Sequence, residues 1–320
     1  MRAEDDELRT AFARVRDEVG KAVVGQGGAV SGLIIALLAN GHVLLEGVPG
    51  VAKTLLVRAL SAALALDTTR VQFTPDLMPG DVTGSVVFDP ATARFEFREG
   101  PVFTNILLAD EINRTPPKTQ SALLEAMEER QVSIDGVSHP LPEPFIVAAT
   151  QNPIEYEGTY PLPEAQLDRF LLKVGLPLPE RDTELEVLRR HSAGFDPRSL
   201  DAAGVTAVVG AAEIAAARTA VTRVGARDDV LGYIVDLARA TRLSPSVRLG
   251  VSPRGATALL AASKAWGWLS GYDAITPDHV KAMAVSVWRH RIQLRPEAEL
   301  EQVTPDAILQ SILQQVQVPI

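Results

Sequence analysis

The stretch Gly47-Val48-Pro49-Gly50-Val51-Ala52-Lys53-Thr54-Leu55 decides the fold of this 320-residue chain. It follows a short apolar strand that we expect over residues 42–46 and opens a helix that we expect over residues 55–66. A glycine-rich turn between a strand and a helix is the setting in which backbone N–H groups and a positive helix N-terminus bind phosphate. We therefore predict a phosphate-binding loop in which Lys53 reaches the β- and γ-phosphates and the Thr54 hydroxyl ligates Mg²⁺.

One position of this loop departs from the pattern G-x-x-x-x-G-K-[ST], because Ala52 stands where that pattern has glycine. Alanine adds only a methyl group, and we expect it to hold a helical conformation there. The alternative interpretation of the stretch is a glycine-rich turn before a helix, without a ligand.

Two acidic residues follow a second apolar strand, in Ile106-Leu-Leu-Ala-Asp110-Glu111. In phosphoryl transfer to water, Asp110 would hold Mg²⁺, directly or through water, and Glu111 would orient and polarise the attacking water. Acids after strands are also common helix caps, so this signal alone is weak. Together with the phosphate loop it predicts a nucleotide-hydrolysing site.

A third apolar strand ends in polar groups, in the run Val147-Ala-Ala-Thr150-Gln151-Asn152-Pro153. The Asn152 side chain could hydrogen-bond the γ-phosphate or the water. A simple Asn-Pro turn is the alternative.

Composition excludes several other functions. The chain has 0 cysteines, which excludes a disulfide scaffold, a thiol nucleophile and a cysteine-based metal site, and its five histidines lack metal-ligand spacing. The net charge of −9 argues against a non-specific nucleic-acid coat. The longest apolar stretch, residues 33–39, is far shorter than the ~20 residues that cross a bilayer, and the acidic N-terminal stretch does not resemble a signal peptide. We expect a soluble, cytoplasmic protein without a membrane span.

Short apolar strands alternate with helices in the first half of the chain, which predicts an α/β domain with a parallel sheet. Residues 86–97 and 130–141 interrupt this pattern and are expected to form inserted hairpins. Past Pro179 the pattern becomes all-helical, and helices are expected to start at Pro253, Pro277 and Pro305, each after a capping hydroxyl. We predict an α/β domain over residues 1–178 and a helical domain over residues 179–320. Arg289-His290-Arg291 is interpreted as a solvated helix face.

These motifs resemble those of AAA+ ATPases and, within them, of the MoxR family. Besides the phosphate loop, the resemblance rests on Leu108-Ala-Asp-Glu-Ile-Asn-Arg-Thr-Pro-Pro-Lys-Thr-Gln-Ser121, Ala149-Thr-Gln-Asn-Pro153 and Pro163-Glu-Ala-Gln-Leu-Asp-Arg169-Phe170, and on Phe73-Thr-Pro-Asp-Leu-Met-Pro-Gly80. It covers nearly the whole chain, and alanine at position 52 is itself similar to the MoxR loop.

The resemblance implies an AAA+ P-loop core with a parallel sheet, flanking helices and hairpin insertions, followed by an all-α lid. It implies ATP as the nucleotide, bound with Mg²⁺ by the phosphate loop from Gly47 to Leu55. Val24, Gly25 and Gln26 look like the segment on the adenine side.

Three residues acquire roles from the resemblance. Asn152 becomes the sensor 1 residue, and Arg169 matches the arginine finger that completes a neighbouring subunit's site. The alternative for Arg169 is an ion pair with Asp168 or Glu164. Arg254 matches sensor 2, and independently it places a cation near a helix N-terminus, which is unfavourable unless an anion binds there. We expect the lid to carry Arg254 towards or away from the phosphate; a surface arginine is the alternative.

The resemblance implies a ring of identical subunits, similar to AAA+ hexamers, with a chaperone-like role in maturing or activating a client. An adaptor with a von Willebrand factor A domain is a possible partner. Two other functions compete: a DNA-directed AAA+ motor or loader, and a nucleotide-switched binding module with little turnover. The acidic charge and hairpins without basic-aromatic interleaving count against nucleic acid, and Asp110, Glu111 and Arg169 count against the switch.

Overall fold

The computed structural model describes residues 2–91, 93–152 and 158–319. Its centre is a five-stranded sheet with the strand order β2-β5-β8-β1-β9, in which all neighbours are parallel. Because all strands run the same way, their carboxyl ends share one end of the sheet, and the opposite end is called the amino end here. The strands are β1 (Val43–Glu46), β2 (Thr68–Gln72), β5 (Ile106–Asp110), β8 (Ile146–Gln151) and β9 (Leu172–Gly175).

Both faces of the sheet are buried, which is typical of parallel sheets. Side chains alternate between the two faces along each strand. In β1, Val43 and Leu45 pack into one hydrophobic cluster, whereas Leu44 packs into the other. The predicted α/β fold with a parallel sheet is therefore confirmed.

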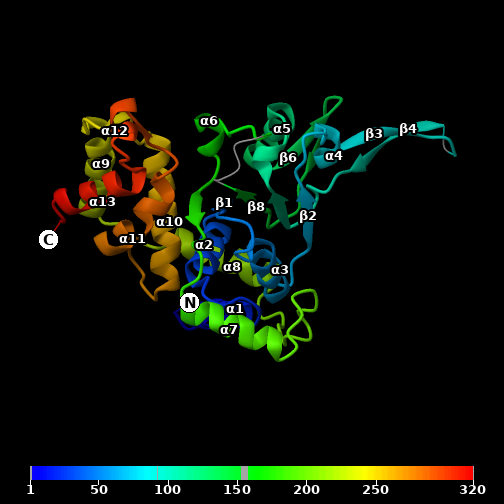
Figure 1. The fold of residues 1–320 in the computed structure, drawn as a ribbon, viewed down its shortest axis with the longest axis horizontal. Coiled ribbons are helices and arrows are strands. Elements are labelled where there is room, and N and C mark those ends of the chain that lie inside the picture. The colour runs from blue at the N-terminus through cyan, green and yellow to red at the C-terminus, as the bar shows by residue number, and fades with distance from the viewer. Residues whose placement is uncertain (1, 92, 153–157, 320) are drawn as a thin grey trace.

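Helices cover the two faces of the sheet (Figure 1). The first cluster is built with α1 (Arg2–Ala22), α2 (Gly27–Leu38) and α3 (Lys53–Ala63). The second is built with α4 (Pro79–Thr83), the 3₁₀ turn η1 (Ile112–Arg114) and α5 (Pro117–Glu129). The helix after the phosphate loop thus begins at Lys53, two residues before the predicted position.

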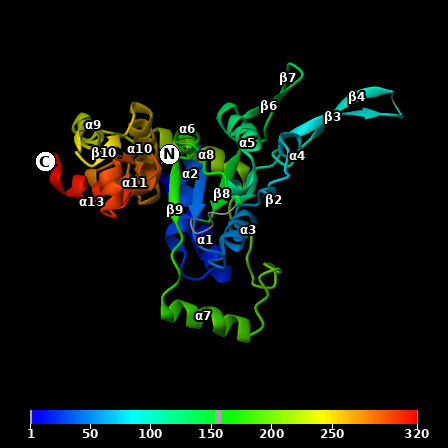
Figure 2. The same ribbon diagram turned by 45° about the horizontal axis from the view of Figure 1, so that its top comes forward.

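Two hairpins project from the α/β part, on the side away from the C-terminal helices (Figure 2). They are β3 (Gly84–Asp89) with β4 (Arg94–Glu99), and β6 (Gln131–Ile134) with β7 (Val137–Pro140). The second turns at Asp135 and Gly136, whose φ angles of 50° and 80° suit a two-residue hairpin turn. Both insertions predicted from the sequence are present.

The chain after the sheet is mostly helical. A short helix, α6 (Glu164–Leu167), precedes β9, and α7 (Arg181–Ser192) and α8 (Ala211–Thr222) follow it. The helices that follow α8 are α9 (Asp228–Leu243), α10 (Pro253–Leu269), α11 (Pro277–Trp288), α12 (Pro296–Leu300) and α13 (Pro305–Gln315). Three of them, α10, α11 and α13, begin at the prolines that were predicted to start helices. The predicted division at residue 178 stays a prediction.

The predicted helical lid is confirmed, with one short addition: β10 (Val247–Leu249) pairs antiparallel with β11 (Gln293–Leu294). Strands of three and two residues are too short to show alternation in the sequence. One expectation for this part was wrong. His290 and Arg291 do not lie on a solvated face. Both are buried where the lid packs on β9, and His290 Nε2 lies 2.9 Å from the Phe170 carbonyl oxygen. Among the described residues, no helix has the length and apolar character needed to cross a membrane.

Candidate nucleotide-binding site

The phosphate loop leaves the carboxyl end of β1, between the two neighbouring strands β8 and β9, and enters α3. Gly47 is required there because a Cβ would lie 2.8 Å from the Leu176 carbonyl oxygen. Gly50 has a φ of 88°, which glycine adopts readily. Lys53 Nζ donates to the Gly47 carbonyl oxygen at 2.5 Å and approaches the Gln151 carbonyl oxygen at 3.5 Å. The ammonium group is thus held over the mouth of the loop.

Ala52 does not have the expected helical conformation. It is the N-cap of α3 with φ 63° and ψ 25°, which is the left-handed region. This conformation directs the backbone from the loop into the helix, and it is unfavourable for an L-residue with a Cβ. Ala52, which stands where the motif has glycine, therefore has a left-handed backbone conformation.

Asp110 is almost fully buried at the carboxyl end of β5, and the side chains of three polar residues contact its carboxylate. Its Oδ1 accepts a hydrogen bond from Thr150 Oγ1 at 2.6 Å, and its Oδ2 accepts one from Arg70 Nη2 at 2.7 Å. Thr54 Oγ1 lies 3.4 Å from the same Oδ2. The two predicted Mg²⁺ ligands are therefore adjacent. Mg²⁺ binds through one or two protein oxygens together with phosphates and water, and this pair fits that requirement.

Glu111 occupies a left-handed conformation with φ 59°, immediately after Asp110. Its Oε2 accepts a hydrogen bond from Gln72 Nε2 at 2.6 Å and an ion pair from Arg114 Nε at 3.1 Å. The carboxylate is thus held by β2 and by the 3₁₀ turn. Arg114 therefore contacts Glu111 of its own chain.

Sequence reasoning missed Arg70 and Gln72, the partners of the two acids. A signal was available: the two residues lie two apart at the end of β2, so their side chains share one face of that strand. The neighbouring strand is β5, which ends at Asp110.

These groups surround a cavity of about 480 Å³. The phosphate loop and the strand ends contribute polar residues to its lining, namely Lys53, Thr54, Asp110, Glu111 and Asn152. Asn152 is buried and follows β8, while Pro153 of the alternative Asn-Pro turn is outside the described residues. The structure therefore brings the three polar segments predicted from the sequence to one place.

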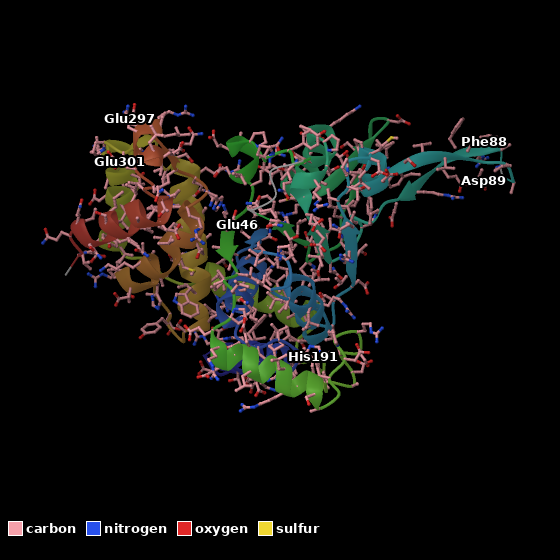
Figure 3. All side chains as sticks on the ribbon, in the orientation of Figure 1. Glu46, Phe88, Asp89, His191, Glu297 and Glu301 are labelled. Atoms are coloured by element: carbon pink, nitrogen blue, oxygen red, sulfur yellow. The ribbon has the colours of Figure 1, made fainter. Side chains whose placement is uncertain are left out.

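The other lining of the cavity is largely apolar, and much of it was not predicted. Val24 lines it as expected, together with Ala22 and Val23. Helix α7 and the loop after it contribute a further set, which consists of Val187, Arg190, His191, Phe195 and Pro197. Figure 3 labels His191 at the end of α7, and its ring meets Phe195 edge-on with centroids 5.4 Å apart. Nothing in the local sequence of α7 indicates that it returns to the phosphate loop.

Five residues of the phosphate loop and of the adenine-side segment, all predicted to contact the nucleotide, do not line this cavity. Val51 is buried in the hydrophobic core, and Gly25 and Gln26 line two neighbouring hollows instead. Gly47 is packed against Leu176, and Val48 packs against the hydrophobic core. Pro49, Gly50, Ala52 and Leu55 line the cavity as predicted.

Arg169 and Arg254 lie together at the opposite, amino end of the sheet. Arg169 precedes β9, close to where the Leu171 N–H donates to the His42 carbonyl oxygen ahead of β1. Arg254 Nη2 contacts Glu128 at 2.7 Å, and Arg169 Nε lies 3.8 Å from the same carboxylate. In this structure Arg254 lies away from the cavity, because the lid is docked on the start of β9. The expectation that the lid carries Arg254 towards or away from the phosphate stays a prediction.

Comparisons with known proteins agree with this geometry. Residues 42–172 match the profile of the ATPase family associated with various cellular activities (AAA), and residues 239–312 match that of the AAA lid domain. The chain is 45% identical to the uncharacterised protein YeaC of Bacillus subtilis, over 99% of this chain and 98% of the relative. It is 40% identical to chaperone MoxR1 of Mycobacterium tuberculosis, over 94% and 81%.

A solved structure is also similar over its whole length. It comes from Cytophaga hutchinsonii and is described as a candidate ATPase. The TM-score is 0.90 at 40% identity, and the match covers 99% of this chain and 98% of that one.

Proposed function

Because this chain belongs to the MoxR family of AAA+ ATPases, we propose that it hydrolyses ATP to ADP and phosphate in the cavity between the phosphate loop and α7. The observation that carries the proposal is the convergence of Lys53, Thr54, Asp110, Glu111 and Asn152 on that one cavity. A triphosphate laid along the loop would place its terminal phosphate beside these groups, with the base towards the apolar lining.

Each polar side chain has a role in this proposal. Lys53 would exchange its carbonyl contacts for phosphate oxygens, and the buried Asn152 would orient the terminal phosphate or the water. Glu111 would polarise the attacking water once its carboxylate is turned from Gln72 and Arg114. Thr54 and Asp110 would hold a Mg²⁺ ion, whose charge neutralises the phosphates.

We propose that the site is completed by a neighbouring copy of the chain. Arg169 and Arg254 are exposed or half-buried on the face opposite the cavity. In a head-to-tail ring, that face of one copy meets the cavity of the next. Guanidinium groups supplied in this way would stabilise charge on the γ-phosphate. The ring size that we propose is the hexamer of the wider AAA+ group.

We further propose that the ring uses ATP hydrolysis to act on a client protein. A relative at 40% identity is named a chaperone, which supports a chaperone-like role in remodelling or activating a client. The two projecting hairpins are available for that contact, and Figure 3 labels Phe88 at the exposed tip of one of them. An adaptor with a von Willebrand factor A domain is the partner that we would test first.

ATP turnover measured against protein concentration tests the proposal, with Glu111→Gln as the blank. We expect activity per subunit to rise with concentration and to vanish in the blank, because the second half of each site comes from a neighbour. Sizing at each concentration relates the rise to assembly.

Turnover that is flat with concentration in a monomer would contradict completion by a neighbour. Bound nucleotide without turnover at any concentration would contradict hydrolysis by this chain alone and favour the nucleotide switch.

A further inference from the structure

One carboxylate contacts both arginines of the amino end. Glu128, near the end of α5, accepts hydrogen bonds from Arg254 Nη2 at 3.0 Å (Oε1) and 2.7 Å (Oε2). The same Oε2 lies 3.8 Å from Arg169 Nε. Glu128 therefore joins an arginine of the lid to an arginine of the α/β part. These are the two arginines that the proposed function assigns to a neighbour's phosphate.

A second carboxylate in the cluster has a different task. Asp168 Oδ1 accepts a hydrogen bond from Arg291 Nε at 2.6 Å, and Asp168 Oδ2 lies 3.5 Å from Arg254 Nε. The Arg291 side chain is only 4% exposed and also donates to the backbone carbonyls of Asp168, Phe170, Leu171 and Val287. Burial lowers the pKa of Arg291, and Asp168 opposes that effect. Arg291 thus holds the lid on β9 without help from Glu128.

Glu128 is free of that structural task and is partly exposed. The Arg254 side chain is 54% exposed, and its hydrogen bonds to Glu128 raise the pKa of its guanidinium. A phosphate recognises a guanidinium through the same N–H groups that a carboxylate uses. A γ-phosphate arriving at these arginines would also meet the negative charge of Glu128. Carboxylate and phosphate therefore compete for the same donors.

We propose that Glu128 is an internal counter-ion that occupies Arg254 and Arg169 until the phosphate of a neighbouring copy displaces it. The inference rests on the proposed function, since it needs the two arginines to serve a site in another copy. In this inference, Glu128 sets the protein concentration at which the composite site forms. In the isolated chain the carboxylate limits repulsion among three clustered arginines, and on assembly it must be released.

The test compares Glu128→Gln with Glu129→Gln, which removes the same charge from the next residue of α5, also exposed. We expect Glu128→Gln to lower the protein concentration for half-maximal ATP turnover by about threefold, the scale of an exposed ion pair. Glu129→Gln should leave that concentration unchanged. Glu128→Asp keeps the charge and should resemble the parent protein. A contact that merely supported the fold would raise the concentration instead of lowering it.

A second measurement separates this inference from the proposed function. In the Glu111→Gln background, which should not turn over ATP, assembly induced by ATP is followed by sedimentation velocity. Glu128→Gln should again assemble at about threefold lower concentration than Glu129→Gln. Equal behaviour of the two variants, or weaker assembly with Glu128→Gln at unchanged thermal stability, overturns the inference. If the parent protein shows no turnover, the proposed function fails, and this assembly comparison still decides on Glu128.

Discussion

Ala52 departs from the residue type of the phosphate-loop motif but has the backbone conformation that glycine readily adopts at such a position. The position has a φ of 63°, so the loop retains the left-handed conformation that glycine adopts in the general pattern. Ala52 lines the cavity together with Lys53 and Thr54. Some local strain is therefore present where phosphate is expected to bind.

Replacing this residue tests the strain directly. Ala52→Gly should raise the free energy of unfolding by about 0.5 kcal/mol, because relief of the left-handed strain exceeds the backbone entropy that glycine loses. Ala52→Val should lower it, since a branched side chain tolerates this conformation less. Urea denaturation of both variants provides the measurement. A destabilised Ala52→Gly variant would show that the position is not strained.

Helix α7 is the element that converts an open phosphate loop into a cavity. Two arginines attach it and the following loop to the rest of the site. Arg190 Nη1 donates to the carbonyl oxygens of Gly20 and Lys21 at 2.9 and 2.8 Å. Arg58, on α3, donates to the carbonyls of Pro197 and Arg198. The apolar wall of the cavity therefore depends on a few polar anchors.

Loss of one anchor should weaken nucleotide binding without unfolding the protein. We expect Arg190→Ala to reduce ATP affinity about tenfold, the scale of two partly exposed charge-assisted hydrogen bonds. Arg189→Ala is the matched control, because this neighbouring arginine is largely exposed and pairs only loosely with Glu186, at 3.9 Å. A fluorescent ATP analogue titrated into each variant gives the affinities. Equal losses in the two variants would exclude α7 as a wall of the binding site.

At the scale of the whole molecule, the parallel sheet separates two sets of functional side chains. The cavity lies at its carboxyl end, and Arg169 and Arg254 lie at its amino end. In Figure 1, α6 lies above the strands and α7 lies below them. In the proposed function, the two sets of side chains of one copy therefore belong to two different sites, each shared with a neighbouring copy.

Mixing two inactive variants tests this separation. Lys53→Ala removes the phosphate contact and Arg169→Ala removes the arginine, so each alone should be inactive. An equal mixture should recover about a quarter of the parent activity, since random head-to-tail neighbours join the two intact halves in that fraction of interfaces. A mixture of Lys53→Ala and Glu111→Gln should recover none, because both changes damage the same half. Recovery in neither mixture would contradict a composite site.

The sequence determined the parts whose signals are local. Lys53, Thr54, Asp110 and Glu111 were predicted from strand ends followed by short polar motifs, and parallel strands must bring such ends together. The hairpins and three lid helices were predicted from turn and capping residues, because these signals also lie within a few neighbouring residues. The family followed from these motifs.

Tertiary structure alone decided the remaining features, because they depend on contacts between residues distant in sequence. The return of α7 to the phosphate loop joins residues 190 and 20, and the burial of Arg291 depends on where the lid packs against β9. The position of Arg254 was decided in the same way, because Glu128 and Asp168 come from two separate elements. No local pattern encodes such distances, since each of these residues would suit a solvated surface equally well.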